Sequence, residues 1–406
     1  MKITYIHQYF ATPKSSGGIR SYLIAKALVE KGHKVNMLTS SAFVPADWNI
    51  AKGWNLFEVN NISVHVLHLP YSNKTGFVKR LYIFLVFMLR TLLKSFSIKA
   101  DLVFATSTPL TVAIPAGLCA SFKRIPFIFE VRDVWPDIPI AMGYLNNKLM
   151  QKVAVWVELW AYKKSQHIIA LSDGMAKRIC DKGVPANKVS VVENFSDNIL
   201  FDSCGSLEQD HSLQKMANFN GKVLTYTGTF GHVNHLKYLI DLAACLQAKN
   251  LDVMFALVGD GREKKELKEY ASMKKVLDKN LVFFQPVRKD QLPWVLANSD
   301  SSISTVLPVK ALWDNSANKF FDALAAGLPV IINHGGWQAD LINESGCGVV
   351  LDHDNVSKAS EQLVSFLSDK DRFSLAKASS KKLANERFDT SLQTDKISQI
   401  LEKFTY

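Results

Sequence analysis

Residues 314–330 read DNSANKFFDALAAGLPV, and this stretch is the most informative part of the sequence. Two carboxylates, Asp314 and Asp322, stand eight positions apart, and the alanine-rich run after Asp322 predicts a helix that begins near residues 316–318. Free N–H groups at a helix start attract anions, and a carboxylate one turn inside can accept hydrogen bonds from ribose or sugar hydroxyls. The stretch therefore favours a nucleotide-sugar site. An ordinary helix with an apolar face fits these residues equally well.

Short apolar runs alternate with helical patterns along the whole chain. Runs of this kind between helices are typical of parallel sheets that are buried on both faces. The sequence therefore predicts an α/β fold with doubly wound, Rossmann-like sheets, whose ligands bind at the carboxyl ends of the strands. We expect strands at residues 2–7, 34–39, 62–67, 102–105, 127–130, 167–171 and 189–192, and then at 223–227, 253–258, 281–284, 301–304, 330–333 and 348–351.

The length of 406 residues suits two domains better than one. A composition rich in Asp, Ser, Gln, His and Asn, without a hydrophobic period, predicts a linker between the two halves. A ligand site is expected in the cleft between the domains. We expect an N-terminal domain over residues 1–200, a linker over 201–221, a C-terminal domain over 222–388 and a C-terminal helix over 389–406.

The chain carries 48 Lys and Arg against 37 Asp and Glu, a formal net charge of +11. A basic balance favours nucleic acid, anionic membranes or anionic small substrates as partners. No zinc-ligand cluster, RNA-binding motif or arginine-rich tail favours nucleic acid. The five cysteines are scattered and form no Cys-x-x-Cys pair, which is typical of a reducing compartment. No signal peptide or apolar run of about 20 residues is recognisable, so we expect a cytoplasmic protein.

Glycine turns follow predicted strands in both halves of the chain. Gly17 and Gly18 come after the first strand, and Gly228 and Gly259 follow strands of the second half. Glycine lets the backbone approach a phosphate at a helix start, although a plain strand-to-helix turn also favours glycine. The glycine turns and the two carboxylates together favour a nucleotide sugar.

A charged cluster, Glu130, Arg132 and Asp133, ends the apolar run 125–129. Buried charges need partners, because an unpaired charge in an apolar environment is costly. The cluster is either a catalytic or acceptor-binding group or an ion pair at a domain edge.

No metal-ligand pattern stands out in the sequence. The histidines show no helical His-x-x-x-His spacing, and the two Asp-x-Asp matches at 352–354 and 369–371 lie away from the glycine turns. We therefore expect no obligatory metal. No Gly-x-Ser-x-Gly elbow is present, which argues against an α/β-hydrolase.

Residues 59–100 contain no acidic residue. Cations and large apolar residues at helical spacing can lie in a membrane interface, especially over anionic lipid. A buried core helix with basic ends is the alternative. The cations of this segment are Lys74, Lys79, Arg80, Arg90, Lys94 and Lys99.

These features together resemble the retaining glycosyltransferases of the GT-B fold that share an E-x7-E motif. The resemblance runs from residue 2 to about 388 and rests on the Gly-Gly loop, the VENFSD strand end at 192–197, the Tyr-Thr-Gly start of the second domain and the Asp pair. FEVRDVWPD at 129–137 and NKFFD at 318–322 are similar to a bacterial subgroup that builds O-antigen and capsule units and includes N-acetyl-L-fucosamine transferases.

The resemblance implies that the N-terminal domain is the acceptor side and that the C-terminal domain binds the nucleotide sugar. It also implies roles for individual residues. Asp322 would accept hydrogen bonds from the ribose, and Lys319 would contact the diphosphate. The expected catalytic residues are Arg132, Asp133, Asp314 and Lys319, and the expected donor-binding residues are Gly17, Gly18, Gly228, Thr229, Gly259, Val287, Asn318 and Asp322.

This chain departs from the family pattern in three places. Both motif glutamates are Asp here, which shortens their reach. The family's Arg and Lys that grip the diphosphate fall near Thr229 and His235, and its strand-end His falls on Arg132. Lys319 is the expected substitute for the missing cations.

The resemblance implies transfer of a sugar from a UDP-linked donor to a saccharide on a polyprenyl diphosphate, with retention of configuration and with no cofactor. The reaction would take place on the inner face of the cytoplasmic membrane, where the protein is peripheral. Two alternatives remain open on the sequence: a UDP-sugar 2-epimerase, and a non-catalytic nucleotide-sugar-binding protein.

Overall fold

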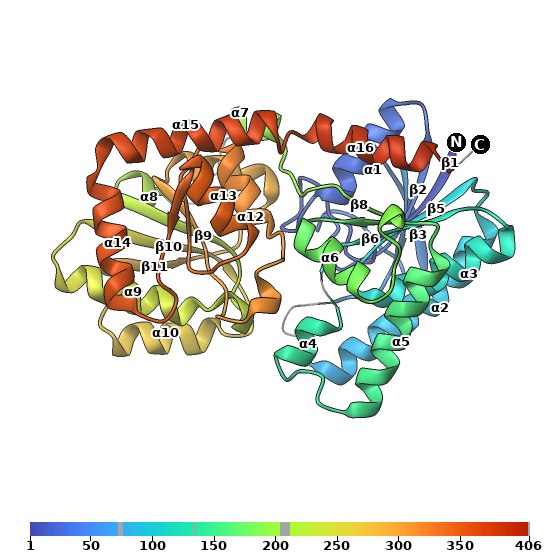
Figure 1. The fold of residues 1–406 in the computed structure, drawn as a ribbon, viewed down its shortest axis with the longest axis horizontal. Helices are drawn as coiled ribbons and strands as arrows, with labels where there is room; N and C mark the ends of the chain where they lie inside the picture. Colours follow the sequence, from blue (N-terminus) through green and yellow to red (C-terminus); the bar gives the residue numbers. More distant parts are fainter. Residues whose placement is uncertain (72–75, 134, 204–211, 405–406) are drawn as a thin grey trace. The chain divides into compact units, whose positions relative to one another are not determined.

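The computed structural model describes residues 1–71, 76–133, 135–203 and 212–404, which form two α/β units (Figure 1). The first unit comprises Met1–Asn194, Asp314–Ser316 and Thr390–Tyr406, and the second comprises Phe195–Trp313 and Ala317–Asp389. Each unit is built on one sheet with helices packed against it, so the predicted α/β class with two Rossmann-like domains is confirmed.

The first unit contains an eight-stranded sheet in the order β3-β4-β2-β1-β5-β6-β7-β8. All pairs except β3 with β4 are parallel, and β5 and β6 are buried along their whole length, as expected for strands covered on both faces. The strands are β1 (Lys2–Ile6), β2 (Lys34–Ser40), β3 (Trp54–Val59), β4 (Ile62–Leu67), β5 (Leu102–Thr106), β6 (Phe127–Val131), β7 (His167–Ala170) and β8 (Val189–Val191).

Strand β3 was not predicted from the sequence. It forms an antiparallel hairpin with β4 at the edge of the sheet. The connecting residues Asn60 and Asn61 have φ angles of 51° and 60°, a conformation that Asn tolerates and that matches the twist of a tight hairpin. The Asn-Asn pair between two apolar runs is the sequence signal that could have revealed the strand.

A large apolar core lies between one face of the first sheet and four helices. It includes Phe87, Cys119, Val157 and Met175, one from each helix. In Figure 1, α1 and α16 lie on the other side of this sheet. The helices of this unit are α1 (Arg20–Glu30), α2 (Phe77–Ser97), α3 (Ala113–Lys123), α4 (Asp137–Ala141), α5 (Lys148–Lys164), α6 (Asp173–Asp181) and α16 (Thr390–Glu402), and the core is formed by α2, α3, α5 and α6.

The second unit contains a six-stranded, fully parallel sheet in the order β11-β10-β9-β12-β13-β14. With the first sheet, it accounts for every strand that the sequence predicted. Its strands are β9 (Lys222–Thr229), β10 (Val253–Asp260), β11 (Leu281–Phe284), β12 (Ser301–Ser304), β13 (Val330–Ile332) and β14 (Gly348–Val350).

Helices pack on the second sheet through separate apolar clusters. Helix α12 begins at Asn318, as the alanine-rich run predicted, and buries Phe320 and Phe321. The helices are α7 (Asn198–Asp202), α8 (Gln214–Ala217), α9 (Leu236–Ala248), α10 (Lys264–Met273), α11 (Leu292–Ala297), α12 (Asn318–Ala325), α13 (Trp337–Ser345), α14 (Val356–Ser368) and α15 (Lys370–Glu386).

The first unit gives way to the second between Asn194 and Phe195, whereas the sequence predicted that the first domain ends at residue 200. Helices α7 and α8 flank the middle of the predicted linker 201–221, and residues 204–211 lie outside the described residues. The C-terminal helix α16 belongs to the first unit, where Asp395 pairs at 2.6 Å with Lys31, the residue directly after α1.

The close packing of β13 against β14 allows a test of the fold of the second unit. A Cβ added to Gly348 would lie 1.9 Å from the carbonyl oxygen of Val330, whereas a Cβ on Gly76 meets no described atom within 4 Å. We expect Gly348→Ala to lower the free energy of unfolding by about 1–3 kcal/mol, because the strands must separate. Gly76→Ala is the control and should change it by less than about 0.5 kcal/mol in urea unfolding. Equal midpoints for the two variants would contradict this packing.

Candidate functional site

Strands β9 and β10 end side by side in the glycine turns that the sequence singled out. Gly228 and Gly259 are paired in register. A Cβ on Gly259 would lie 1.9 Å from the carbonyl oxygen of Gly228, so Gly259 is required by the contact between the two turns. Gly228 has φ of +139°, and a Cβ there would lie 3.6 Å from Cε of Lys319. The glycines thus bring the backbone close to a lysine side chain.

Lys319 lies in the first turn of α12, against the end of β9. Its Nζ is 3.1 Å from Oη of Tyr226 and 3.1 Å from Oδ1 of Asn234, and it lies 4.2 Å from the centre of the Tyr226 ring. No described carboxylate lies within ion-pair distance of this Nζ. Burial lowers the pKa of Lys319 to about 7. A buried amine without an acidic partner is suited to receive an anionic group.

Tyr226 and Asn234 also fix the turn after β9. Tyr226 belongs to the Tyr-Thr-Gly motif, but neither residue was predicted as a site residue. The Tyr226 hydroxyl and the Asn234 amide both donate to the carbonyl oxygen of Thr229, at 2.8 and 2.9 Å. The predicted residues Gly228, Thr229 and Lys319 are therefore brought together. Asn318 is the first residue of α12, next to Lys319.

Asp322 is buried one turn inside α12, where two further residues hold it. Its Oδ1 accepts a hydrogen bond from the Ser196 hydroxyl at 2.6 Å and an ion-paired hydrogen bond from Nζ of Lys289, which is also buried. No described residue donates to Oδ2. Lys289 stands two positions after Val287 in the segment that follows β11, and Val287 packs against an apolar cluster of the second unit. Ser196 lies in the VENFSD motif but was not predicted as a site residue, and Lys289 was not singled out at all.

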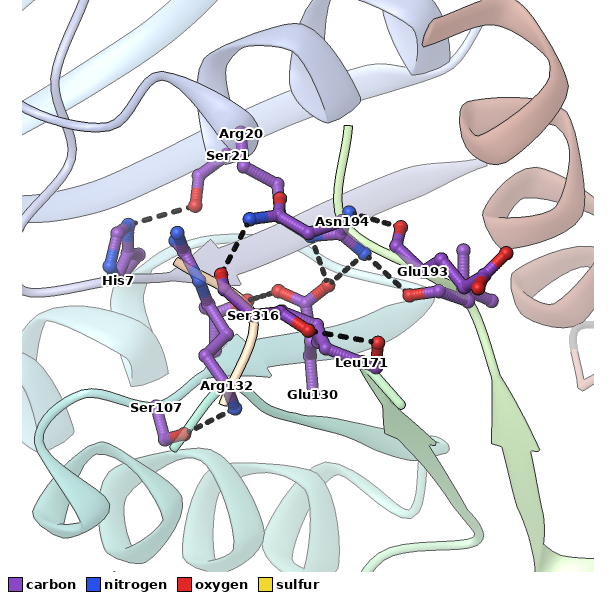
Figure 2. Close-up of polar contacts among 12 residues, drawn as sticks. His7, Arg20, Ser21, Ser107, Glu130, Arg132, Leu171, Glu193, Asn194 and Ser316 are labelled. Atoms are coloured by element: carbon purple, nitrogen blue, oxygen red, sulfur yellow. Dashed lines mark hydrogen bonds and ion pairs between the residues drawn. The ribbon is translucent and has the colours of Figure 1, made fainter. Parts of the chain in front are cut away.

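The first unit holds a buried ion pair at the carboxyl ends of its strands, shown in Figure 2. Nε of Arg20 donates to Oε1 of Glu130 at 3.0 Å, and the Thr106 hydroxyl donates to Oε2 at 2.8 Å. The other Arg20 nitrogens donate to the carbonyl oxygens of Val192 and Glu193. For Glu130, the ion pair is therefore the correct interpretation. The sequence did not single out Arg20, although it stands two positions after Gly18.

Arg132 and Asp133 lie at the same edge of the first sheet. Asp133 accepts a hydrogen bond from the Thr108 hydroxyl, and the Arg132 guanidinium points toward His7 (Figure 2). His7 lies 2.9 Å from the Ser21 hydroxyl through Nδ1. Burial, and then the charge of Arg132, lower the pKa of His7 well below its usual range. A neutral imidazole and a cation are thus placed together, a pairing that the sequence did not predict.

Gly17 and Gly18 lie in the loop before α1. A Cβ on Gly17 would lie 2.9 Å from Cβ of Ala11 and 3.6 Å from the Phe43 ring. Packing against Ala11 therefore explains the glycine at position 17.

Asp314 has its own partners in the first unit, separate from those of Asp322. Its Oδ2 accepts from Nε of Arg178 at 2.5 Å, and its carbonyl oxygen accepts from the Ser172 hydroxyl at 2.8 Å. A Cβ on Gly174 would lie 2.2 Å from Oδ1 of Asp314, so glycine leaves room for this carboxylate at the start of α6. The two motif carboxylates are each fixed by a different basic residue, Arg178 and Lys289.

Within the described residues, no three His, Cys, Asp or Glu side chains are arranged to hold a metal ion.

Two family models match this chain. One, described as glycosyltransferase family 4, matches residues 17–198, and the other, glycosyl transferases group 1, matches residues 209–383. This chain belongs to the glycosyltransferases. The family assignment agrees with the two-unit fold and with the glycine turns and basic residues at the strand ends.

Two curated proteins are similar in sequence. The Escherichia coli UDP-Gal:alpha-D-GlcNAc-diphosphoundecaprenol alpha-1,3-galactosyltransferase is 25% identical over 261 residues, or 63% of this chain. An uncharacterized 41.2 kDa protein in the cps region of Klebsiella pneumoniae is 22% identical over 217 residues, or 53% of this chain. The matches span 65% and 56% of these relatives' own lengths.

Solved structures share the fold at low sequence identity. HepE of Anabaena, in complex with UDP and glucose, has a TM-score of 0.72 at 18% identity, covering 99% of this chain and 100% of that one. WaaG, a glycosyltransferase involved in lipopolysaccharide biosynthesis, has a TM-score of 0.68 at 14% identity and covers 99% of both chains. The GT-B architecture implied by the resemblance is thereby confirmed.

The Arg20–Glu130 pair predicts a large effect on stability. Glu130→Gln leaves the buried Arg20 cation without its counter-charge, so the free energy of unfolding should fall by about 3–5 kcal/mol. The exposed pair Lys26–Glu30 serves as the control, and Glu30→Gln should cost at most about 1 kcal/mol. Urea unfolding of both variants measures the difference, and similar losses would contradict the role of the buried pair.

Proposed function

We propose that this protein is a retaining glycosyltransferase that moves a sugar from a UDP-sugar to a saccharide on a polyprenyl diphosphate during bacterial O-antigen or capsule assembly. One observation carries the donor half of the proposal. Lys319 places a buried amine without an acidic partner beside the Gly228 turn, where the negative diphosphate of a nucleotide sugar would supply the missing counter-charge. The name of the Escherichia coli relative supports a UDP-sugar and a lipid-linked acceptor.

The nucleotide is proposed to bind mainly to the second unit. Asp322 has one oxygen held by Ser196 and Lys289, which leaves Oδ2 to accept hydrogen bonds from the ribose hydroxyls. Val287 precedes Lys289 in the same segment and is proposed to contact the base. Thr229, Gly259 and Asn318 complete the donor site by shaping the backbone around Lys319.

The proposed reaction is a front-face displacement. The bond between the anomeric carbon and the diphosphate oxygen breaks, and the bond to the acceptor oxygen forms on the same face of the sugar. The acceptor hydroxyl gives its proton to the departing diphosphate, so no side chain needs to act as the base. Lys319 stabilises the charge that grows on the leaving group, and Arg132 and Asp133 are proposed to orient the sugars, together with Asp314.

The donor sugar is proposed to be a hexose or an N-acetylamino sugar, with N-acetyl-L-fucosamine as the first candidate. The Escherichia coli relative is named for galactose, so UDP-galactose is the second. A screen of UDP-sugars with a short-chain diphosphate-linked acceptor tests this point, because product mass identifies the transferred sugar and product NMR reads the anomeric configuration. Inversion of configuration would overturn the retaining mechanism.

Membership of the glycosyltransferases argues against the 2-epimerase interpretation. The same screen separates these functions: an epimerase would interconvert UDP-sugars without an acceptor, and a binding protein would bind UDP without turnover.

A lipid-linked acceptor requires the protein to work at a membrane surface, and we propose a peripheral association on the cytoplasmic face. No helix in the described part of the chain is both long and apolar enough to span a bilayer. The basic segment 74–99 remains the proposed contact. Lys74 lies outside the described residues, and the rest of the segment is mainly helix α2.

The pKa of Lys319 predicts proton uptake on nucleotide binding. At pH 8 the free amine, with a pKa of about 7, is mostly neutral, and the diphosphate raises this pKa because it favours the ammonium. UDP affinity should therefore be highest below pH 7 and should fall as the pH rises above it. Titration calorimetry at pH 8 in buffers of different ionisation enthalpy should show uptake of up to about one proton.

Two variants control this experiment. Lys319→Arg stays charged, so it should bind UDP without proton uptake and with little pH dependence. Lys319→Met should lose the uptake and lower kcat about 100- to 1000-fold, more than it changes the affinity for the donor. Uptake that persists in Lys319→Met would place the titrating group elsewhere.

Asp322 yields a separate prediction about the ribose. Removing a charged acceptor of a buried hydrogen bond costs about 1.5–3 kcal/mol, so Asp322→Ala should bind UDP about 10- to 100-fold more weakly, with Asp322→Glu milder. The preference of the unaltered protein for UDP over 2′,3′-dideoxy-UDP should disappear in Asp322→Ala. A thermal melt is needed beside the calorimetry because the variant also unpairs Lys289. A retained preference for the ribose hydroxyls would remove this role.

A further inference from the structure

Most of the large apolar side chains that are exposed in the described structure lie on three helices of the first unit, α2, α3 and α5. Several are mostly in solvent: Val78 is 80% exposed, Phe122 77% and Leu149 70%. The others on these helices are Leu81, Tyr82, Leu85, Leu89, Leu93, Phe96, Leu118, Val153, Trp156 and Leu159. We call the outward side of these helices the three-helix face.

The three helices form one continuous surface because α3 packs between the other two. The rings of Phe96 on α2 and Phe122 on α3 are in edge contact, with centres 5.0 Å apart. On the other flank, a Cβ on Gly117 of α3 would lie 2.8 Å from the Trp160 ring of α5. The apolar stripes of neighbouring helices are therefore adjacent.

Helix α2 carries two apolar stripes. Ile83 and Phe87 point into the core, while the exposed residues recur at positions 78, 82, 85, 89 and 93, the spacing of a second helical stripe. Helix α5 repeats this at positions 149, 153 and 156. A buried core helix with basic ends needs no outward stripe, so α2 differs from that alternative. An apolar patch of this kind, bordered by charged residues, marks an interaction surface.

The charges on the three-helix face have one sign. The single acidic residue of the three helices is Glu158, which is buried and paired with Lys182. The basic residues are Lys79, Arg80, Arg90, Lys94, Lys123, Lys148, Lys152, Lys163 and Lys164. The partner of this face must therefore accept both apolar side chains and many cations.

We propose that the three-helix face docks on the surface of an anionic lipid bilayer, with residues of α3 and α5 inserted beside those of α2. The inference rests on the proposed function, because a lipid-linked acceptor lies in such a bilayer. A second copy of this chain fits less well, since two copies joined through the same face would bring cations against cations. A bilayer with anionic headgroups satisfies the apolar stripes and the cations together.

The test compares two double variants of the full-length protein. Phe122→Ser with Trp156→Ser alters α3 and α5, which the sequence alone did not connect with a membrane. Met273→Ser with Leu375→Ser is the matched control, because these residues are 78% and 59% exposed on helices of the second unit. Flotation with phosphatidylglycerol-containing vesicles and with phosphatidylcholine vesicles, at about 0.1 M and about 1 M salt, measures binding. A thermal melt checks that each variant is folded.

We expect the unaltered protein and the control to float with anionic vesicles at low salt and to be partly released at high salt. The Phe122 and Trp156 variant should bind at least about tenfold more weakly, because two large apolar groups no longer enter the bilayer. The inference would be overturned if both variants bound vesicles equally or if the unaltered protein bound no vesicles at any salt concentration. It would also be overturned if the unaltered protein were a dimer that the Phe122 and Trp156 variant dissociates.

Two acceptors separate this inference from the proposed function. With an acceptor embedded in vesicles, the Phe122 and Trp156 variant should lose transfer, whereas with a short-chain, water-soluble acceptor it should match the unaltered protein. If the unaltered protein bound vesicles but transferred sugar to neither acceptor, the membrane-docking surface would be supported and the proposed function rejected. Sugar transfer to the soluble acceptor by an unaltered protein that does not bind vesicles would support the proposed function and reject the membrane-docking surface.

Discussion

The first unit depends on the buried ion pair between Arg20 and Glu130. Glu130 is the last residue but one of β6, an interior strand of the sheet, and Arg20 begins the helix that follows the Gly-Gly loop. By also donating to the carbonyl oxygens of Val192 and Glu193, the same guanidinium fixes the segment that leaves the last strand. Three parts of the chain that are far apart in sequence therefore meet at one cation. Breaking such a pair is costly because it leaves a buried charge without compensation.

The second unit contains the opposite arrangement. Lys319 is held by a hydroxyl, an amide and an aromatic ring, none of which carries a negative charge. Nearby, the buried Lys289 has a full partner in Asp322. Lys289 thus has a negatively charged partner within the protein, whereas the described partners of Lys319 are all uncharged. This contrast, more than the presence of basic residues as such, is what favours a diphosphate site beside Gly228.

The charged residues of the chain are also unevenly distributed. Along α2, α3 and α5, exposed cations accompany exposed apolar residues and no exposed acid is present. Helices that cover a sheet need one apolar side, and here a second one is added. This extra surface costs solubility, so it implies a partner, and the lipid-linked acceptor proposed for the donor site would provide one.

The sequence by itself determined the fold class, the start of α12 and, among the described residues, every strand but one. These follow from local periodicity and from glycine and alanine patterns, which act over a few residues. The missed strand β3 is a half-exposed edge strand whose pattern is weak. The sequence also predicted Lys319 and Asp322 as site residues because they lie within one short motif, and the structure shows that both side chains are held by polar partners.

Only the tertiary structure decided which side chains share an environment. The partners of Lys319 and Asp322, namely Tyr226, Asn234, Lys289 and Ser196, come from distant segments. Likewise, the sequence could not show that α3 and α5 extend the exposed surface of α2. The physical reason is the same in both cases: hydrogen bonds, ion pairs and burial depend on distances between segments, and spacing along the chain encodes distances only within one segment.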